Sequence, residues 1–217
     1  MSRTSPPLRV AVCDYGAGNL HSLGKALAAP DVEVRVESDA RLAADRARTD
    51  LMVLPGVGGF EAAAERLAPA RDEIRAAAGA GLPVLGICLG MQLFFEESEE
   101  GVGQGLGLLS GRVRRLRARR VPQIGWNQLE PEGQRETALA EGTLRVAYYA
   151  NSYVCEPEDV RWVTAWSEHE GDRFPASVRG GVGGSVVGVQ FHPEKSSTAG
   201  VDFLRRLLAR VRAELSR

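Results

Sequence analysis

The sequence has little cysteine and little histidine, and it has no excess of charge of either sign. Its 217 residues include three cysteines, three histidines, 27 basic side chains and 28 acidic ones. The three cysteines, Cys13, Cys88 and Cys155, are odd in number and widely spaced, which does not suit a disulfide framework. A net charge of −1 lacks the basic excess that a broad surface for nucleic acid or an anionic membrane requires.

Long apolar runs and metal-ligand spacings are also missing. No apolar run approaches the roughly 18 residues of a membrane span, and the first seven residues hold no apolar core of a signal peptide. Neither Cys-x-x-Cys nor His-Glu-x-x-His occurs, so we expect no metal and no cofactor. What remains is an enzyme-sized cytoplasmic protein, which we expect to fold as one domain over residues 1–217.

Short apolar runs alternate with helical patterns in the first half of the chain. We expect strands at 8–13, 32–36, 51–54 and 83–87, with helices beginning near residues 20, 40, 60 and 90. The helix at 60–80 is expected to break near Pro69, and the last of the four to run from 90 to 97. Residues 111–190 show short β-rich runs, and an amphipathic helix follows Ser196. The pattern predicts an α/β fold, flavodoxin-like, with a mainly parallel central sheet flanked by helices and an antiparallel β extension.

The candidate nucleophile is Cys88, which lies where a strand turns into a helix. Gly86 and Gly90 flank it at two residues on either side, so the chain can make a tight elbow and a substrate can approach. The following helix should direct its N-terminus at the sulfur, lower the thiol pKa and supply backbone donors for an oxyanion. Cys13 and Cys155 lack such glycines, and we interpret them as buried structural residues.

A thiolate nucleophile needs a base, and the sequence offers three histidines. His21 lies on the first predicted helix and His169 in an acidic loop-like stretch, so both are interpreted as solvated side chains. His192 follows an apolar strand and is followed two residues later by Glu194. A Cys–His–Glu set results, with Cys88 attacking, His192 transferring the proton and Glu194 orienting the imidazole, which is suited to acyl transfer or hydrolysis.

A glycine-rich loop, Pro55 to Gly59, follows the third predicted strand. The carboxyl ends of parallel strands share one edge of a sheet, so this loop should face Cys88. Its N–H groups could stabilise a tetrahedral intermediate, although a plain tight turn is the alternative interpretation. Neither Gly-x-Gly-x-x-Gly nor a Gly-Lys-Ser/Thr ending is present, which argues against nucleotide binding.

These motifs together resemble a known family. The segment Gly86–Gln92, combined with Gln190–Glu194, is similar to the signatures of class I (triad) glutamine amidotransferases, in which a cysteine releases ammonia from glutamine through a glutamyl thioester. Three further segments, 14–19, 122–127 and 191–196, resemble those of the glutaminase subunits of imidazole glycerol phosphate synthase in histidine biosynthesis. The likeness covers nearly the whole chain, and we expect no fused synthase domain.

The resemblance implies a role for individual residues. The triad would be Cys88, His192 and Glu194, and the oxyanion hole would use the backbone of Gly56, Val57, Gly58 and Leu89. The glutamine substrate would be held by Gly58, Gln92, Glu100, Ser152 and Tyr153. A cyclase subunit, HisF in the naming of the family, would form a heterodimer with the chain, contact Asn19, Trp126 and Lys195, and use the ammonia to make imidazole glycerol phosphate and AICAR from PRFAR. The likeness also implies low glutaminase activity until the partner binds its nucleotide.

Two positions depart from the family pattern. Histidine is expected in place of Gln123, before the Gly-Trp-Asn segment, and in place of Asn151, before Ser152. Neither position belongs to the triad, and the expected consequence is a change in partner contacts or coupling.

A cluster of six arginines lies between Arg112 and Arg120, close behind an acidic run at 96–100. It is interpreted as a charged strand edge or as a surface for an acidic or phosphorylated ligand. Two other functions also remain open, namely a different triad amidotransferase or cysteine hydrolase, and a catalytically silent regulatory subunit.

Overall fold

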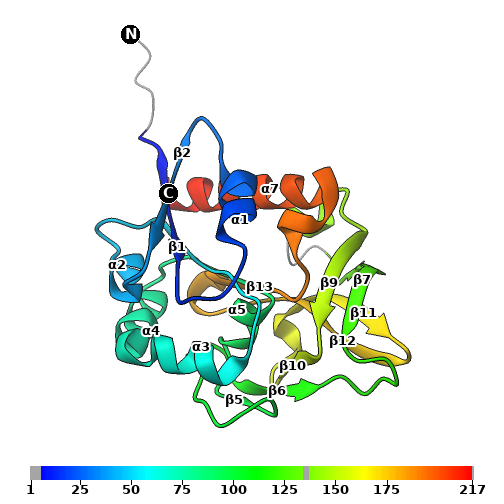
Figure 1. The fold of residues 1–217 in the computed structure, drawn as a ribbon. Coiled ribbons are helices and arrows are strands. Elements are labelled where there is room, and N and C mark those ends of the chain that lie inside the picture. Colours follow the sequence, from blue (N-terminus) through cyan, green and yellow to red (C-terminus); the bar gives the residue numbers. More distant parts are fainter. Residues whose placement is uncertain (1–5, 134–136, 217) are drawn as a thin grey trace.

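The computed structural model describes residues 6–133 and 137–216. An eight-stranded sheet runs through the molecule in the order β2-β1-β3-β4-β13-β12-β11-β8 (Figure 1). The first five of these strands are parallel to one another, and β12, β11 and β8 continue the sheet with antiparallel pairing. The predicted α/β fold with a mainly parallel sheet and an antiparallel extension is therefore confirmed.

The strands of this sheet come from both halves of the chain. They are β1 (Leu8–Cys13), β2 (Val32–Glu37), β3 (Leu51–Leu54), β4 (Val84–Ile87), β8 (Glu130–Pro131), β11 (Val163–His169), β12 (Asp172–Gly180) and β13 (Val186–Val189). Two smaller sheets hold β5 (Glu97–Ser98), β6 (Gly111–Arg115) and β10 (Tyr153–Pro157), and β7 (Gln123–Gln128) with β9 (Val146–Asn151). The helices are α1 (Leu20–Leu27), α2 (Ala40–Ala44), α3 (Phe60–Leu67), α4 (Arg71–Gly79), α5 (Leu89–Gln92), α6 (Thr137–Ala140) and α7 (Ser197–Leu215), with short 3₁₀ turns η1 (Ala68–Ala70), η2 (Val160–Trp162), η3 (Val182–Gly184) and η4 (Pro193–Lys195).

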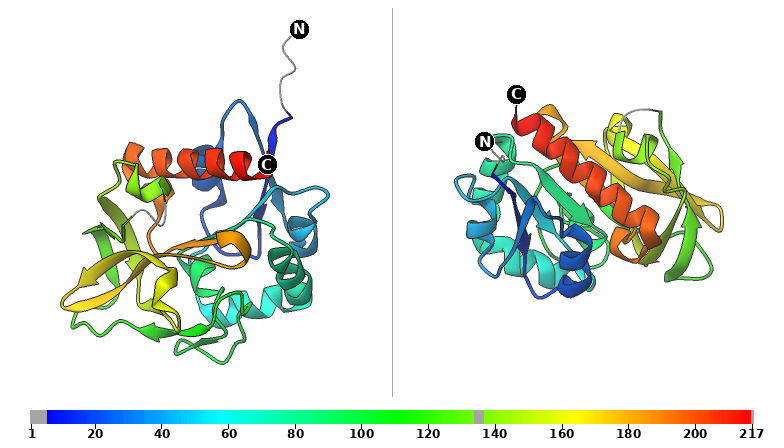
Figure 2. Two further views of the ribbon diagram at one scale, coloured as in Figure 1. Left: turned by 180° about the vertical axis from the view of Figure 1, so that it is seen from behind. Right: turned by 90° about the horizontal axis from the view of Figure 1, so that it is seen from above.

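The parallel strands β1, β3, β4 and β13 are largely apolar on both faces, and helices cover both sides of the sheet (Figure 2). Successive side chains of a strand point to opposite faces, so Val10 and Val12 pack on the side of α1 and α7, while Ala11 and Cys13 pack on the side of α2, α3 and α4. Burying apolar side chains on both faces is typical of parallel sheets. It leaves the loops at the strand ends as the accessible places for chemistry.

One expectation about local structure differs from the structure, and another is confirmed. The helix predicted at 90–97 is the single turn α5, because Phe94 and Phe95 are fully buried and the chain then turns into β5. The long helix at 60–80 is divided by η1 around Pro69, as predicted. No helix among residues 6–133 and 137–216 has both the length and the hydropathy needed to cross a membrane.

The arginine cluster does not form a sheet edge. Strand β6 lies between β10 and β5, so the edge interpretation is wrong. Several of its charges are paired with carboxylates of the same chain, since Arg112 pairs with Glu156 at 2.8 Å and Arg120 pairs with Glu170 at 2.6 Å. Much of the cluster therefore serves to hold β6 and the segment after it against β10 and β12.

The innermost of these pairs joins Arg114 to Asp172. Nη1 and Nη2 of Arg114 donate to the two carboxylate oxygens of Asp172 at 2.7 and 2.8 Å, and the N–H of Arg117 donates to the same carboxylate at 2.7 Å. Both side chains are 7% exposed. A buried, bidentate pair of this kind ties β6 to the start of β12.

Removing one partner of this pair should destabilise the protein because a buried charge is left without its counter-ion. We expect Asp172→Ala to lower the free energy of unfolding by about 3 kcal/mol, and the Tm by roughly 6–12 °C for a chain of this size. Glu130→Ala, which removes the carboxylate of the exposed Arg173–Glu130 pair, should cost less than about 1 kcal/mol. Equal Tm values for the two variants, measured by circular dichroism, would contradict the structural role of Arg114 and Asp172.

Candidate active site

Cys88 lies at a sharp elbow between β4 and α5. Its backbone has φ 52° and ψ −108°, a region that non-glycine residues rarely adopt. The elbow is held on both sides, because the N–H of Cys88 donates to Val189 at 2.7 Å and its carbonyl accepts from Gln92 at 3.1 Å. A side chain in such a turn is presented beyond the end of the strand, as expected for a nucleophile. α5 contains only four residues, so its dipole is much weaker than the expected longer helix would have supplied.

The glycines beside Cys88 are needed for close packing. A side chain on Gly90 would overlap the carbonyl oxygen of Leu54, and one on Gly86 would lie 2.6 Å from the carbonyl oxygen of Gly90. Neither glycine has a positive φ. The two positions therefore bring the elbow against β3 and the loop that follows it.

His192 and Glu194 lie together where β13 leads into η4. Nδ1 of His192 is 2.9 Å from Oε1 of Glu194, and the two side chains are 2% and 5% exposed. Nε2 of His192 is buried without a hydrogen-bond partner among the described residues. The carboxylate holds Nδ1, which leaves Nε2 for a proton at the reacting centre.

The imidazole of His192 lies beside the Cys88 sulfur and the Glu194 carboxylate. Burial alone would lower its pKa, but the Cys88 sulfur and the Glu194 carboxylate outweigh burial and raise the pKa of His192 to about 9. The imidazole is then protonated at neutral pH, next to Cys88. A protonated imidazole next to the sulfur can act as a general acid toward a leaving group.

Gln190 is a residue of this site that the sequence reasoning missed. It is fully buried, and its Nε2 donates to Sγ of Cys88 at 3.5 Å while its Oε1 accepts from Nε2 of Gln92 at 3.2 Å. Gln190 directly follows β13, and no pattern of neighbouring residues distinguishes it, because its contact with Cys88 spans 102 positions of the chain.

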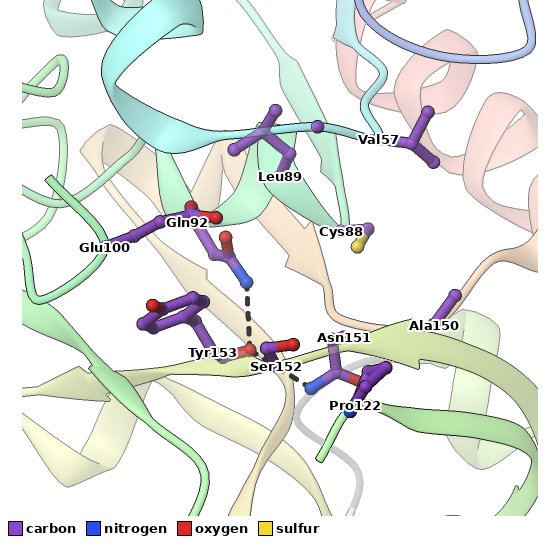
Figure 3. A pocket seen from close by; sticks show the side chains of 11 residues that line it. Val57, Cys88, Leu89, Gln92, Glu100, Pro122, Ala150, Asn151, Ser152 and Tyr153 are labelled. Atoms are coloured by element: carbon purple, nitrogen blue, oxygen red, sulfur yellow. Dashed lines mark hydrogen bonds between the residues drawn. The ribbon is translucent and has the colours of Figure 1, made fainter.

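A cavity of about 140 Å³ opens beside the Cys88 sulfur (Figure 3). Most of the residues predicted to bind substrate or oxyanion line it, and Figure 3 shows Val57 and Leu89 on the side opposite Ser152 and Tyr153. The lining residues are Val57, Gly58, Cys88, Leu89, Gln92, Glu100, Pro122, Ala150, Asn151, Ser152 and Tyr153. Gly56, His192 and Glu194 lie outside the lining.

Hydrogen bonds hold the polar groups around this cavity. Nε2 of Gln92 and Nδ2 of Asn151 donate to the carbonyl of Tyr153 at 3.0 and 3.1 Å, and both bonds are drawn in Figure 3. A carboxylate oxygen of Glu100 accepts from the N–H of Phe60 at 2.8 Å and so connects the acidic segment to the start of α3. Buried polar groups with fixed partners provide a preorganised surface for a small polar ligand.

The other cysteines and histidines lie away from this chemistry. Burial raises the pKa of Cys13 to about 12 and that of Cys155 well above its ordinary value, so both remain protonated thiols. His21 is exposed on α1, and a ring nitrogen of His169 is 2.9 Å from the carbonyl of Arg120. The structure describes all three cysteines and all three histidines. Of these, Cys88 and His192 lie next to each other.

The residues predicted to face a partner are exposed. Trp126 is 57% exposed, and its ring meets that of Tyr148 edge-on at 6.1 Å between centroids. Nζ of Lys195 lies 5.8 Å from the centre of the Tyr148 ring. Asn19 is exposed at the start of α1, where its side chain accepts from the N–H of Ser22 at 3.1 Å.

The two positions that depart from the family pattern face each other across one strand pair. Gln123 of β7 is directly opposite Asn151 of β9. Both are buried, at 4% and 5% exposure. Asn151 lines the cavity, and Gln123 lies behind it as its cross-strand neighbour.

The chain is similar to one family of known proteins over most of its length. The family description Glutamine amidotransferase class-I matches residues 11–210. The chain is 42% identical over 200 residues to imidazole glycerol phosphate synthase subunit HisH of Pyrococcus furiosus, covering 91% of this chain and 96% of that one. It is 44% identical over 202 residues to subunit HisH of Symbiobacterium thermophilum, covering 90% and 91%.

Solved structures share the fold at lower identity. The structure of PurLQS from Thermotoga maritima matches with a TM-score of 0.73 at 20% identity, covering 94% of this chain and 98% of that chain. A glutamine amidotransferase from Thermotoga maritima matches with a TM-score of 0.62 at 19% identity, covering 98% of this chain and 85% of that chain. The match over residues 11–210 and the relatives at 42% and 44% identity lead to one conclusion. This chain belongs to the class I glutamine amidotransferase family.

Proposed function

We propose that the chain is the glutaminase subunit of imidazole glycerol phosphate synthase, and that it hydrolyses L-glutamine to glutamate and ammonia at Cys88. The observation that carries this proposal is the arrangement of Cys88, His192 and Glu194 beside a small polar cavity. Relatives with the subunit name HisH, at about 40% identity over nine-tenths of the chain, support the choice of synthase. The proposed location is the cytoplasm.

The reaction begins with the Cys88 thiolate and the His192 imidazolium. The sulfur attacks the side-chain carbonyl carbon of glutamine, and the carbonyl oxygen becomes an oxyanion. His192 then donates its proton to the leaving nitrogen, and ammonia departs as the thioester forms. A water molecule gives its proton to His192 and attacks the thioester, which releases glutamate and restores the thiolate. Glu194 keeps the imidazole oriented and compensates its charge throughout.

Backbone N–H groups on one side of the cavity are the proposed oxyanion donors. Gly56, Val57 and Gly58 lie in the loop after β3, and Leu89 follows the nucleophile directly, as in other nucleophile elbows. Donors of this kind act most strongly when they are already in place as charge develops. The polar groups of Gln92, Glu100, Ser152 and Tyr153 form part of the remaining cavity wall and are proposed to hold the amino-acid end of glutamine.

The proposed partner is a cyclase subunit of the HisF type, which would receive the ammonia. The surface around Trp126, Tyr148 and Lys195 supports this assignment, since Trp126 and the neighbouring Ile124 are 57% and 68% exposed. Exposed aromatic and apolar side chains in a contiguous group are characteristic of protein interfaces. Asn19 lies on the proposed interface as well.

A catalytically silent regulatory subunit is the alternative from a different functional class. It would need no nucleophile, yet the cysteine, the imidazole and the carboxylate are all present and adjacent here. This arrangement favours an active glutaminase. Release of glutamate from glutamine is the direct measurement that separates the two functions.

Substitution of the nucleophile tests the core of the proposal. In the complex with the cyclase, Cys88→Ala should abolish glutamine-dependent synthesis and leave synthesis from added ammonium salts near the wild-type rate, because ammonia bypasses the glutaminase site. Cys155→Ala, which removes a fully buried cysteine, is the matched control and should retain glutamine-dependent synthesis. Loss of both activities in a folded, partner-bound Cys88→Ala protein would refute the assigned role.

The pKa of His192 leads to a second test. Because the imidazole stays protonated up to about pH 9, His192→Gln removes a positive charge beside the sulfur at pH 7. We expect iodoacetamide to alkylate Cys88 at least ~10-fold more slowly in this variant at pH 7. The difference should narrow above pH 9, where the wild-type imidazole also becomes neutral. Peptide mass spectrometry gives the rate at Cys88 alone, and equal rates at pH 7 would count against the ion pair.

Dependence on the partner gives a third test. Glutamate release by the isolated chain should rise on addition of the cyclase subunit and its nucleotide ligand. Trp126→Ala should weaken binding to the cyclase, measured by calorimetry, by about 1–2 kcal/mol, as is typical of an interface aromatic residue. Val160→Ala, on an exposed residue of η2, is the control. Full activity of the isolated chain would contradict a subunit that delivers ammonia on demand.

A further inference from the structure

The hydroxyl of Tyr15 is buried against the loop proposed as the oxyanion hole. Tyr15 follows β1 by two residues and is 5% exposed. Its Oη donates a hydrogen bond to the carbonyl of Pro55, the first residue of the loop. No step of the proposed glutaminase reaction uses the Tyr15 hydroxyl.

The first peptide of the loop is held from more than one direction. A side chain on Gly56 would lie 2.7 Å from Cβ of Leu89 and 3.1 Å from Oη of Tyr15. A side chain on Gly18, where φ is +106°, would lie 3.2 Å from Cβ of Pro55. The Pro55–Gly56 peptide therefore lies between the turn that follows β1 and the Cys88 elbow.

The loop has a held end and an open end. Pro55 and Gly56 are buried, whereas Val57 is 43% exposed. Among the described residues other than its chain neighbours, none has a heavy atom within 4 Å of the place that a side chain on Gly58 would take. The open end has room to change conformation, so the held end decides where any such change starts.

The chemistry of Tyr15 suits it to act as a permanent donor. Burial raises its pKa well above the ordinary value, and the nearby Cys13 and Cys88 raise it further. The hydroxyl thus keeps its proton when the Cys88 sulfur is charged. A peptide unit is planar, so a fixed Pro55 carbonyl oxygen also fixes the direction of the Gly56 N–H and the path of the chain into Val57.

We propose that Tyr15 is a positioning residue that orients the Pro55–Gly56 peptide, so that the N–H groups of the loop point at the oxyanion formed on Cys88. The inference rests on the proposed glutaminase function. Tyr15 acts through the loop and does not touch the substrate. Its removal should therefore affect formation of the tetrahedral intermediate more than binding of glutamine or ionisation of the thiol.

The test is Tyr15→Phe, measured in the complex with the cyclase and its nucleotide ligand. We expect kcat for glutamate release to fall about tenfold, because small displacements of catalytic groups cost this much or more, with KM unchanged within about twofold. Alkylation of Cys88 by iodoacetamide should keep its wild-type rate. That reaction displaces iodide at a saturated carbon and forms no oxyanion, so it does not need the loop.

Tyr149→Phe is the matched control. Tyr149 is fully buried among Phe174 and Phe191, and loss of its hydroxyl should leave kcat unchanged. Gly18→Ala is a second variant that presses on Pro55 from the other side and should reproduce the fall in kcat without a fall in alkylation. The Tm of each variant verifies folding.

Two outcomes would overturn the inference. An unchanged kcat in both Tyr15→Phe and Gly18→Ala would show that the contact does not position the loop. A parallel loss of kcat and alkylation would show that Tyr15 acts on the Cys88 thiol instead. Failure of the proposed function itself has a different signature, namely glutamate release that persists in Cys88→Ala.

Discussion

The backbone of the Cys88 elbow lies directly against the end of strand β3, and the geometry of the site depends on this contact. There is no room for a side chain on Gly90, because it would overlap the carbonyl of Leu54. Leu54 is followed at once by the loop that begins with Pro55. Any widening of the contact would separate the nucleophile from the loop that is proposed to stabilise its oxyanion. The glycines of the elbow thus allow the ends of β3 and β4 to lie close together. Their small size is what the site requires, since neither glycine has a positive φ.

The base is held by a different part of the fold. The N–H of His192 donates to the carbonyl of Tyr148 at 2.8 Å. The hydroxyl of Ser196 donates to the carbonyl of His192 at 2.6 Å and accepts from the N–H of Tyr148 at 2.9 Å. Strand β9 therefore carries the backbone of the base on its edge, while the Tyr148 ring lies beside Trp126 on the proposed partner surface. Because these hydrogen bonds join β9 to His192, a shift of β9 would also shift the backbone of the proposed base.

Local patterns were enough to predict the parallel half of the fold, and they also led to the proposal of Cys88, His192 and Glu194 as a triad. The strand at 51–54 and the glycine-flanked elbow at Cys88 are each formed by residues that are close in the chain. A short stretch of sequence was therefore sufficient to predict them. Tyr15 and Gln190 could not be found in this way, because their roles arise from contacts with Pro55 and Cys88, which are 40 and 102 residues away. The same reason applies to the arginine cluster. An arginine-rich strand looks like a protected edge until the distant partner of Arg114, Asp172, is known.

The strand register shows that the two departures from the family pattern, Gln123 and Asn151, lie at one place in the structure. Gln123 and Asn151 are 28 positions apart in the numbering, but they form one cross-strand pair and both point inward. Among the described residues, no group donates a hydrogen bond to Oε1 of Gln123 or to Oδ1 of Asn151. A change at one position alters the space and the hydrogen bonding of the other, so the two departures amount to a single change in the cavity wall. Because neither side chain reaches the exposed surface of Trp126, any influence on the partner must pass through β7 and β9 rather than through direct contact.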